Sequence, residues 1–444
     1  MALSGLDIYK ILPKTNCKEC GFVTCLAFAM QLAKKGVEAG KCPYLSEEAG
    51  NILADAGRPP INLVSIGSGD GCLKVGNETV LFRHEEKFRN PCGIGFIIDD
   101  VLPGEQIKRT ASRLGGVSFD RVGQILKPDV IAVRQSSNSA EKFAAAVKAA
   151  VDASGLNPVL MPSDASGLRA ALEAVKGTAP LIYRVTKDNI REFMPLAAQA
   201  RVPAAVYGDT LEEQAELVKE LNGGGVAQIL LDTGEQEPRE RIWRLTQWRR
   251  QALKKNNRLL GYPAVTVLKG KDPYSVAVEA AGDICKYAGL ILLEVSEAEE
   301  TLALLTLRQN IYSDPQRPLQ IEPKVYTIGN AGKESPVLIT TNFSLTYFTV
   351  LGEVESSKVP SYIVSVDTEG MSVLTAWAAE KFTPEKITDS LQKFGVSGLV
   401  GHNRLIIPGY VAMMSGNLEE KSGWEVVVGP KEASGLPAFL KNLS

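Results

Sequence analysis

Residues 130–162 read VIAVRQSSNSAEKFAAAVKAAVDASGLNPVLMP, in which a helical pattern separates two short apolar runs. Ser139 stands where a helix N-cap is expected, and Phe143, Val147 and Val151 then recur on one face of the helix. The runs VIAVRQ and PVLMP at the two ends are strand candidates. The stretch therefore predicts a strand–helix–strand unit, the building block of a parallel sheet.

The same alternation continues on both sides of this unit, so that eight apolar runs succeed one another. Eight strand–helix units match a (β/α)8 TIM barrel in count and length, and two smaller open sheets are the alternative. The candidate strands are GFIIDD (95–100), VIAVRQ (130–135), PVLMP (158–162), PLIYRV (180–185), PAAVYG (203–208), QILLDTG (228–234), AVTVL (264–268) and LILLEV (290–295).

Charged residues stand at the ends of several candidate strands. In a barrel these residues face the carboxyl-end rim, where enzymes of this architecture place their active sites. No spacing among them marks an acid–base pair or a metal triad, so we expect a solvated rim or a partner-binding surface on a scaffold barrel. The residues are Asp99, Asp100, Arg134, Arg184, Asp232 and Glu294.

A second α/β unit follows the proline-containing stretch PLQIEPK (318–324). Thr383 as cap and Pro384 at the first helical position start one of its helices. The unit predicts a small doubly wound, Rossmann-like sheet that binds ligands at the carboxyl ends of its strands. Its candidate strands are SPVLITT (335–341), SYIVSVDT (361–368), LIIPG (405–409) and WEVVVG (424–429).

Small and hydroxyl residues fill the loops after these strands, as in TTNFS (340–344) and DTEGMS (367–372). Such loops at helix starts can approach a large flat ligand closely and hydrogen-bond to it. Neither a P-loop nor a G-x-G-x-x-G motif occurs, which leaves nucleotide binding with little support. The loops therefore predict a ligand pocket, and ordinary helix capping is the alternative.

Four cysteines lie close together near the N-terminus, at Cys17, Cys20, Cys25 and Cys42. Thiolates are soft ligands, and four of them can enclose a metal centre. The spacing C-x2-C-x4-C-x16-C lacks the second C-x2-C pair that structural zinc sites usually show, and a proline follows Cys42. A [4Fe–4S] cluster is the favoured interpretation, while zinc and unligated thiols are the alternatives.

Composition limits the classes of function. The chain of 444 residues has a net charge of −2, so electrostatics gives no case for nucleic-acid binding. No apolar stretch approaches the length of a membrane span and no signal-peptide pattern is present, so we expect a cytoplasmic protein without disulfides. The remaining cysteines, Cys72, Cys92 and Cys285, are expected to be small core residues.

Breaks in the pattern suggest three domains. NLVSIG (62–67) is followed by GSGDG but by no helix, so it predicts a β-hairpin and not a dinucleotide site. The residues Gly57-Arg58-Pro59-Pro60 form a linker before this hairpin. We expect an iron–sulfur domain at 1–57, the hairpin, barrel and linker at 58–318, and a ligand-binding domain at 325–444.

The opening GLDIYKILPKTNCKECGFVTCLAFAM, the distant KCPYL, the barrel and the C-terminal unit together resemble the large (gamma) subunit of the corrinoid iron-sulfur protein. This family serves the acetyl-CoA synthase/carbon monoxide dehydrogenase system of the anaerobic reductive acetyl-CoA (Wood–Ljungdahl) pathway of carbon fixation. The resemblance extends over essentially the whole chain, and its motif LPKTNCxECGxxTCxAFA is specific.

The resemblance implies a methyl carrier, a methyltransferase-type corrinoid protein. A cobalamin-type corrinoid would accept a methyl group from methyltetrahydrofolate on Co(I), through a separate methyltransferase, and donate it to acetyl-CoA synthase. The [4Fe–4S] cluster on the four cysteines would reactivate cobalt that has been oxidised to Co(II). The family works as a heterodimer with a small subunit, with the corrinoid between the two, and a reductive activator is a further expected partner.

Many cobalamin-binding methyltransferases supply a lower-axial histidine from a D-x-H-x-x-G motif, and this chain has no such motif. His402 lies in LVGHNR, with Val400 where Asp would be needed. The resemblance therefore implies a base-off corrinoid without a protein imidazole, and His402 is expected to be a structural or pocket-wall residue. An iron–sulfur electron-transfer or scaffold subunit without its own corrinoid is the alternative. By resemblance, the corrinoid contacts map onto Thr340, Thr346, Gly370, Met371, Ser372, Val373 and Ala433.

Overall fold

The computed structural model describes residues 4–33, 36–46, 49–50, 53, 58–121, 123–270, 272–294, 298–316 and 318–443. The chain forms two compact units, one of residues 1–118 with 127–312 and one of residues 119–126 with 313–444. Gly57, at the predicted linker, lies outside the described residues, and the division into three domains stays a prediction. Within the described ranges, none of the helices combines the length and the apolar character that a membrane crossing requires.

The cysteine segment contains two short helices that pack against each other. Ser4 caps the first helix, because its Oγ accepts a hydrogen bond from the backbone N–H of Asp7 at 3.2 Å. The fully buried ring of Phe28 lies at the centre of the apolar contacts between the helices. The predicted helix after Cys25 is confirmed. The elements are α1 (Gly5–Ile11), α2 (Cys25–Ala33) and the 3-10 turn η1 (Ala39–Lys41).

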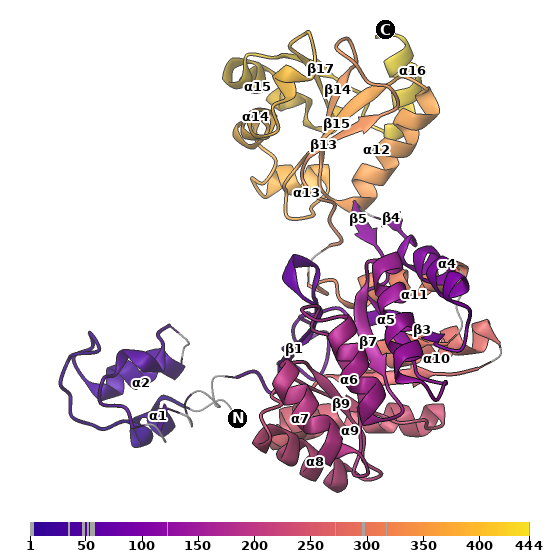
Figure 1. Cartoon of the computed structure of the whole chain (residues 1–444). Helices are drawn as coiled ribbons and strands as arrows, with labels where there is room; N and C mark the ends of the chain where they lie inside the picture. Colours follow the sequence, from indigo (N-terminus) through magenta and orange to yellow (C-terminus); the bar gives the residue numbers. More distant parts are fainter. Residues whose placement is uncertain are drawn as a thin grey trace. The chain divides into compact units, whose positions relative to one another are not determined.

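Eight parallel strands close into a barrel in the order β10-β11-β12-β3-β6-β7-β8-β9 (Figure 1). Each of them falls on a predicted apolar run, so the (β/α)8 barrel is confirmed and the alternative of two open sheets is wrong. The strands are β3 (Gly93–Asp99), β6 (Val130–Arg134), β7 (Asn157–Met161), β8 (Leu181–Val185), β9 (Ala204–Val206), β10 (Ile229–Asp232), β11 (Ala264–Leu268) and β12 (Ala288–Leu293).

Helices surround the barrel strands, and α5 shows how the sequence sets their ends. Ser139 Oγ accepts from the N–H of Lys142 at 3.2 Å, as the N-cap prediction requires, and Gly155 ends the helix in a left-handed conformation. The helices are α4 (Gly104–Gly115), α5 (Ala140–Ser154), α6 (Ala165–Ala174), α7 (Ile190–Ala200), α8 (Leu211–Gly223), α9 (Pro238–Lys255), α10 (Pro273–Cys285) and α11 (Ala298–Ile311).

The predicted hairpin is present as β1 (Leu63–Ile66) and β2 (Leu73–Gly76), which pair antiparallel. Its apolar side chains, among them Val64 and Val75, join the same buried cluster as barrel residues such as Val159 and Leu230. The barrel interior is therefore packed with side chains, as small barrels require.

The three isolated cysteines differ in burial. Cys92 is buried as predicted and Cys72 is half-buried. Cys285 is exposed, so its prediction as a core residue is wrong. It lies on the outer face of α10, the same face as Val278 seven residues earlier, which is 72% exposed.

The second unit is built on a five-stranded sheet in the order β13-β15-β14-β16-β17, in which β13 alone of the strands described runs antiparallel. The doubly wound sheet is confirmed, and its antiparallel edge strand was not predicted. The strands are β13 (Val325–Ile328), β14 (Val337–Thr341), β15 (Ser361–Val366), β16 (Arg404–Ile407) and β17 (Glu425–Val428).

Helices cover both faces of this sheet, with α12 and α16 on one face and α14 and α15 on the other (Figure 1). Thr383 caps α14 and Pro384 occupies its first turn, as predicted. The helical elements are α12 (Ser344–Ser357), α13 (Val373–Ala378), α14 (Pro384–Lys393), the 3-10 segment η5 (Gly409–Met414), α15 (Ser415–Ser422) and α16 (Leu436–Lys441).

A short hairpin of β4 (Phe119–Arg121) and β5 (Gln124–Leu126) also belongs to the second unit, although it lies between α4 and β6 in the sequence. Gly123 at its turn lies against Tyr326, whose hydroxyl would be 3.0 Å from a Cβ placed on that glycine. The second unit is therefore assembled from two separate stretches of chain.

Candidate functional site

The predicted cluster cysteines Cys17, Cys20 and Cys25 lie in or directly after the loop between α1 and α2. The backbone of this loop adopts left-handed conformations at Asn16 (φ 51°) and Lys18 (φ 69°), which turn the chain sharply. Asn16 Oδ1 accepts from the N–H of Cys25 at 2.8 Å, and the N–H of Asn16 donates to Cys25 Sγ at 3.4 Å. Hydrogen bonds to sulfur of this kind tune iron–sulfur clusters.

The four thiols lie near one another. Burial raises the pKa of the Cys42 thiol, and the neighbouring thiols of Cys20, Cys17 and Cys25 raise it further. Among the residues that the structure describes, no three cysteine, histidine or carboxylate side chains converge tightly enough to share one metal ion. A four-iron cluster does not need such convergence, because each thiolate binds a different iron.

The apolar core beneath the cysteine loop is small. Its buried members include Ile8, Leu12, Phe28 and Leu53, together with Cys25 and Cys42 themselves. A segment of this size buries too little apolar surface to be stable without help, and natural units of this kind commonly depend on a metal centre. The residues present therefore fit a cluster that also stabilises the fold around it.

A hollow of about 340 Å³ opens at the carboxyl ends of β14 and β16. The two strands are neighbours, and between them the strand order reverses, since β15 lies on one side of β14 and β16 on the other. Open α/β sheets bind their ligands at this switch point. The walls include Leu338, Thr346, Val350, Ser372, Ile406, Ala433 and Leu436.

The structure brings five of the seven predicted corrinoid contacts to this hollow, namely Thr340, Thr346, Ser372, Val373 and Ala433. Gly370 and Met371 do not line it. The side chain of Met371 packs against the apolar core on the opposite face, and the backbone N–H of Gly370 is directed at Asn342. Their role as corrinoid contacts stays a prediction.

Thr340 brings a buried hydroxyl to the hollow. Its Oγ1 has no hydrogen-bond partner among the described residues, although the residue is only 1% exposed. Ser365 lies opposite it on β15, with its own hydroxyl buried and unpartnered. A buried hydroxyl without a partner is unfavourable, and this oxygen has almost no surface open to the hollow, so a ligand reaches it only when the wall shifts. Thr340 and Thr346, which line the hollow beside apolar side chains, fit a ligand that is partly apolar and partly hydrogen-bonding.

Sequence reasoning missed Asn342, which follows β14. Its side chain is buried and hydrogen-bonds to residues from two other segments, including the turn that leads to Ser372. An asparagine after a strand is common in turns and caps, so no signal in the sequence distinguished this one.

His402 lies at the amino end of β16, whereas the hollow opens at the carboxyl ends of the strands. Its Nε2 is 3.1 Å from the carbonyl oxygen of Ser335, and its Nδ1 accepts from the N–H of Arg404 at 3.2 Å. Both ring nitrogens are therefore engaged with backbone. The structural role predicted for His402 agrees with this position, and it is not among the residues that line the hollow.

Exposed apolar side chains surround the mouth of the hollow. Leu345 is 67% exposed, Leu374 46% and Tyr410 43%, and all three line the hollow. Met413, in the same 3-10 segment as Tyr410, is 74% exposed. Apolar groups gathered at an open site mark a surface that another molecule covers.

The carboxyl-end mouth of the barrel has the opposite character, because its charged residues pair with one another. Arg134 donates from Nε and Nη2 to the two oxygens of Asp99 at 2.7 and 2.8 Å, and its Nη1 donates to Glu294. These hydrogen bonds hold the pKa of Asp99 below its ordinary value. Asp100 accepts from the N–H groups of Ser136 and Ser137.

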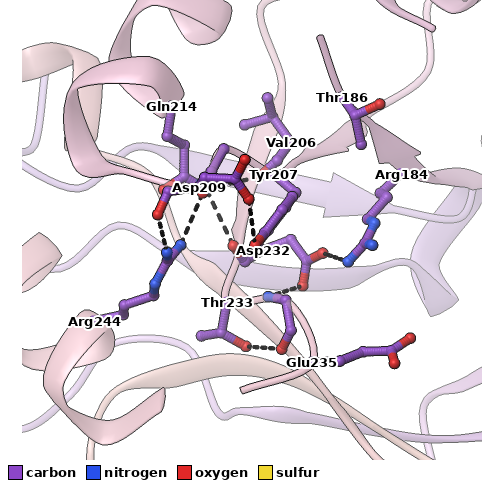
Figure 2. Close-up of polar contacts among 12 residues, drawn as sticks. Arg184, Thr186, Val206, Tyr207, Asp209, Gln214, Asp232, Thr233, Glu235 and Arg244 are labelled. Atoms are coloured by element: carbon purple, nitrogen blue, oxygen red, sulfur yellow. Dashed lines mark hydrogen bonds and ion pairs between the residues drawn. The ribbon is translucent and has the colours of Figure 1, made fainter. Parts of the chain in front are cut away.

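Figure 2 shows the second half of this network, in which Arg184 is directed at Asp232. The Nη1–Oδ2 distance is 3.0 Å, and the guanidinium also lies 4.6 Å from the ring centre of Tyr207. Asp232 is fully buried, and burial raises its pKa. The predicted solvated rim is therefore wrong for Asp100 and Asp232, because both carboxylates are buried. Asp232 pairs with Arg184, and Asp100 accepts from backbone N–H groups.

Comparisons with known proteins agree with one another over the length of the chain. The family model for the CO dehydrogenase/acetyl-CoA synthase delta subunit matches residues 63–440, and an Fe-S cluster family model matches residues 12–44. The "Corrinoid/iron-sulfur protein large subunit" of Moorella thermoacetica is 44% identical over 99% of this chain and 99% of its own. The "Acetyl-CoA decarbonylase/synthase complex subunit gamma" of Methanothermobacter thermautotrophicus is 34% identical over 100% of both chains.

Proposed function

This chain belongs to the CO dehydrogenase/acetyl-CoA synthase delta-subunit family, and from that premise we propose that it is a corrinoid methyl carrier. A bound corrinoid would supply a cobalt able to accept a methyl group from methyltetrahydrofolate, through a methyltransferase, and to pass it to acetyl-CoA synthase. The observation that carries the proposal is the hollow at the switch point of the C-terminal sheet, which Thr340, Thr346 and Ser372 line together with apolar side chains.

Different residues of the hollow are assigned to the apolar and the polar parts of the corrinoid. A volume of about 340 Å³ takes only part of so large a cofactor, so we infer that the detached lower base enters it. Leu338, Val350 and Ile406 then contact the apolar surface of the base. Thr346 would hydrogen-bond to a polar atom of the base, Thr340 would do so once the wall shifts, and the macrocycle would remain outside the hollow. No histidine lines the hollow, which favours a base-off corrinoid without an imidazole from this pocket.

The apolar rim around the mouth is assigned to the small subunit. Leu345, Leu374 and Tyr410 lie around the hollow with much of their surface exposed. A partner that covers the outer face of the macrocycle would bury these side chains and exclude water from the cobalt. The methyltransferase, acetyl-CoA synthase and a reductive activator are then transient partners that need access to the same site.

The cysteine segment is assigned to electron delivery. Cys17, Cys20, Cys25 and Cys42 would hold a [4Fe–4S] cluster, which supplies a low-potential electron when the cobalt has been oxidised. The hydrogen bonds around Asn16 and Cys25 hold the loop in shape for this cluster. The cluster thus keeps the cofactor competent and takes no part in methyl transfer itself.

Visible spectroscopy of the anaerobically purified chain with its small subunit tests the carrier function. We expect a corrinoid band that changes when methyltetrahydrofolate and its methyltransferase are added. A cluster spectrum without any corrinoid band, even after incubation with cobalamin, would instead support an electron-transfer or scaffold subunit. A colourless protein with stoichiometric zinc would overturn the assignment of the cysteines.

Replacement of Cys20 by alanine tests the role of the cluster. We expect methyl transfer from previously reduced protein to continue, whereas reductive reactivation is lost. The exposed Cys285→Ala is the matched control and should alter neither step. Loss of both steps in Cys20→Ala, together with unfolding of the cysteine segment, would show that the cluster acts chiefly as a structural element.

A further inference from the structure

We propose that Asn342 is a positioning residue that holds the turn Asp367–Leu374 in its cofactor-binding conformation. The proposal rests on the proposed function, because the end of this turn forms part of the hollow assigned to the corrinoid. Asn342 does not line the hollow itself. Its role is argued from the hydrogen bonds of one buried amide and from the backbone conformation that those bonds stabilise.

The carbonyl oxygen of the Asn342 side chain accepts from three donors of the turn. The backbone N–H of Thr368 donates at 2.9 Å, the hydroxyl of Thr368 at 2.9 Å, and the backbone N–H of Gly370 at 3.0 Å. Asn342 is 1% exposed, so these bonds form away from water. A buried donor left without its acceptor costs the full desolvation penalty, which makes the oxygen of Asn342 difficult to replace.

The amide nitrogen of Asn342 contacts two further segments. It donates to Gln320 Oε1 and to Asp367 Oδ1, both at 3.2 Å. Gln320 belongs to the stretch that leads from the barrel into the C-terminal unit. The backbone N–H of the next residue, Ile321, donates to the backbone carbonyl oxygen of Asn342 at 3.0 Å. One side chain therefore joins this stretch to the turn after β15.

The conformation of the turn explains why such a residue is needed. Glu369 and Gly370 are both left-handed, with φ of 56° and 74°. Consecutive left-handed residues are unfavourable, particularly for a residue with a long side chain. Gly370 is also packed so closely that an added Cβ would lie 2.6 Å from Gln320 Cγ. The Asn342 amide offsets this strain and so directs the chain into Ser372, Val373 and Leu374, which line the hollow.

The chain offers a specific test of this role. In Asn342→Asp the three acceptor bonds can persist, but the donor is lost and the new carboxylate faces Asp367. The double variant Asn342→Asp with Asp367→Asn exchanges the two groups, so that residue 367 can donate to residue 342. Its amide then gives up the bond that Asp367 Oδ1 accepts from the N–H of Glu369 at 3.1 Å, so the expected rescue is partial. A role that depends on this hydrogen bond predicts rescue by the exchange. Thr341→Val is the matched control, because Thr341 is an adjacent buried residue whose hydroxyl has no partner.

The experiment uses the full chain with its small subunit, freed of corrinoid, and hydroxocobalamin as the probe. Absorbance titration gives the dissociation constant, and hydrogen exchange of the corrinoid-free protein gives the protection of the Thr368 and Gly370 amides. For Asn342→Ala we expect affinity to fall about tenfold or more, because buried hydrogen bonds are lost, with faster exchange at both amides. Thr341→Val should bind and exchange like the unaltered chain.

Recovery of affinity and protection in the exchanged pair, relative to Asn342→Asp alone, would establish the positioning role. Asn342→Ala with unaltered affinity and unaltered exchange would overturn it. If the unaltered chain itself does not bind hydroxocobalamin, the proposed function fails. In that case the exchange of the two amides alone decides whether Asn342 holds the turn.

Discussion

The carboxyl-end mouth of the barrel and the carboxyl edge of the C-terminal sheet arise from the same strand–helix repeat, yet they differ in how their polar groups are satisfied. At the barrel mouth, Arg134 forms ion pairs with Asp99 and Glu294, and Arg184 forms one with Asp232. At the C-terminal sheet, buried hydroxyls remain without partners beside an open hollow. A strand edge becomes a binding site when its polar groups are left for a ligand to satisfy.

This difference has an energetic consequence that can be measured. Polar groups that pair internally contribute to folding, and their loss should destabilise the protein without affecting ligand binding. Polar groups that await a ligand cost stability, and their loss should weaken binding without destabilising the fold. The two regions should therefore respond in opposite ways when their polar groups are removed.

The largest effect is expected for Arg184→Ala, which leaves the fully buried Asp232 without its cation. A buried charge that loses its partner costs about 3–5 kcal/mol, so the barrel transition in calorimetry should shift strongly to lower temperature. Affinity for hydroxocobalamin should not change. Lys187→Ala is the control, because this exposed rim cation pairs with Asp209 and Glu213 in solvent and its loss should have little effect.

A pH-dependent stability of the barrel is expected from Asp283 of α10, which accepts from Nε of Arg241 of α9 at 2.7 Å. Burial raises the pKa of Asp283 to about 6. The folded chain then keeps a proton that the unfolded chain has lost, so the unfolding free energy should fall as pH rises from about 4 to about 6, by up to about 3 kcal/mol.

Asp283→Asn isolates this contribution from the other carboxylates of the barrel. The difference in unfolding free energy between the unaltered chain and the variant should depend on pH between about 4 and about 6 and be constant above that range. A difference that does not vary with pH would show that Asp283 is ionised in the folded chain throughout.

In the C-terminal unit, Ala433→Phe should fill the hollow with a ring. Ala433 is half-buried and lines the cavity of about 340 Å³, so we expect affinity for hydroxocobalamin to fall about a hundredfold. Ala438→Phe is the control, because Ala438 is exposed nearby and does not line the hollow. Equal affinities of the two variants would place the corrinoid elsewhere.

The smallest effect, and the most diagnostic, is expected for Thr340→Val. Removing a buried hydroxyl without a partner should leave the unfolding free energy unchanged or slightly raised, while affinity for hydroxocobalamin falls about tenfold. Thr341→Val should show the same stability response without the loss of affinity, because successive strand residues face opposite sides of the sheet. Destabilisation by Thr340→Val would mean that its hydroxyl is satisfied within the protein.

Local patterns were sufficient to predict much of the architecture. The spacing of Phe143, Val147 and Val151 after the Ser139 cap predicted α5, and repetition of that pattern predicted the barrel. The absence of a helix after GSGDG predicted the first hairpin. These features depend on neighbouring residues, whose preferences are readable from the sequence.

Features that depend on closure of the chain could not be predicted in this way. Arg134 and Glu294 are far apart in sequence and meet only because β12 and β6 flank β3 in the closed barrel. Asn342 contacts the turn after β15 and Gln320 only once the second sheet has formed. Five of the seven residues that the resemblance predicted line the hollow, whereas the left-handed conformation of Gly370 could not be predicted from the sequence.

The hairpin of β4 and β5 has a consequence for how the protein is made. It emerges from the ribosome with the first barrel strands, yet Tyr326, against which its turn rests, is synthesised only after the last barrel helix. The second unit is thus a discontinuous domain that cannot complete its fold until most of the chain exists. All barrel strands are therefore synthesised before the second unit can finish folding. A fragment that starts at residue 325 would lack the hairpin at 119–126, which belongs to its own domain.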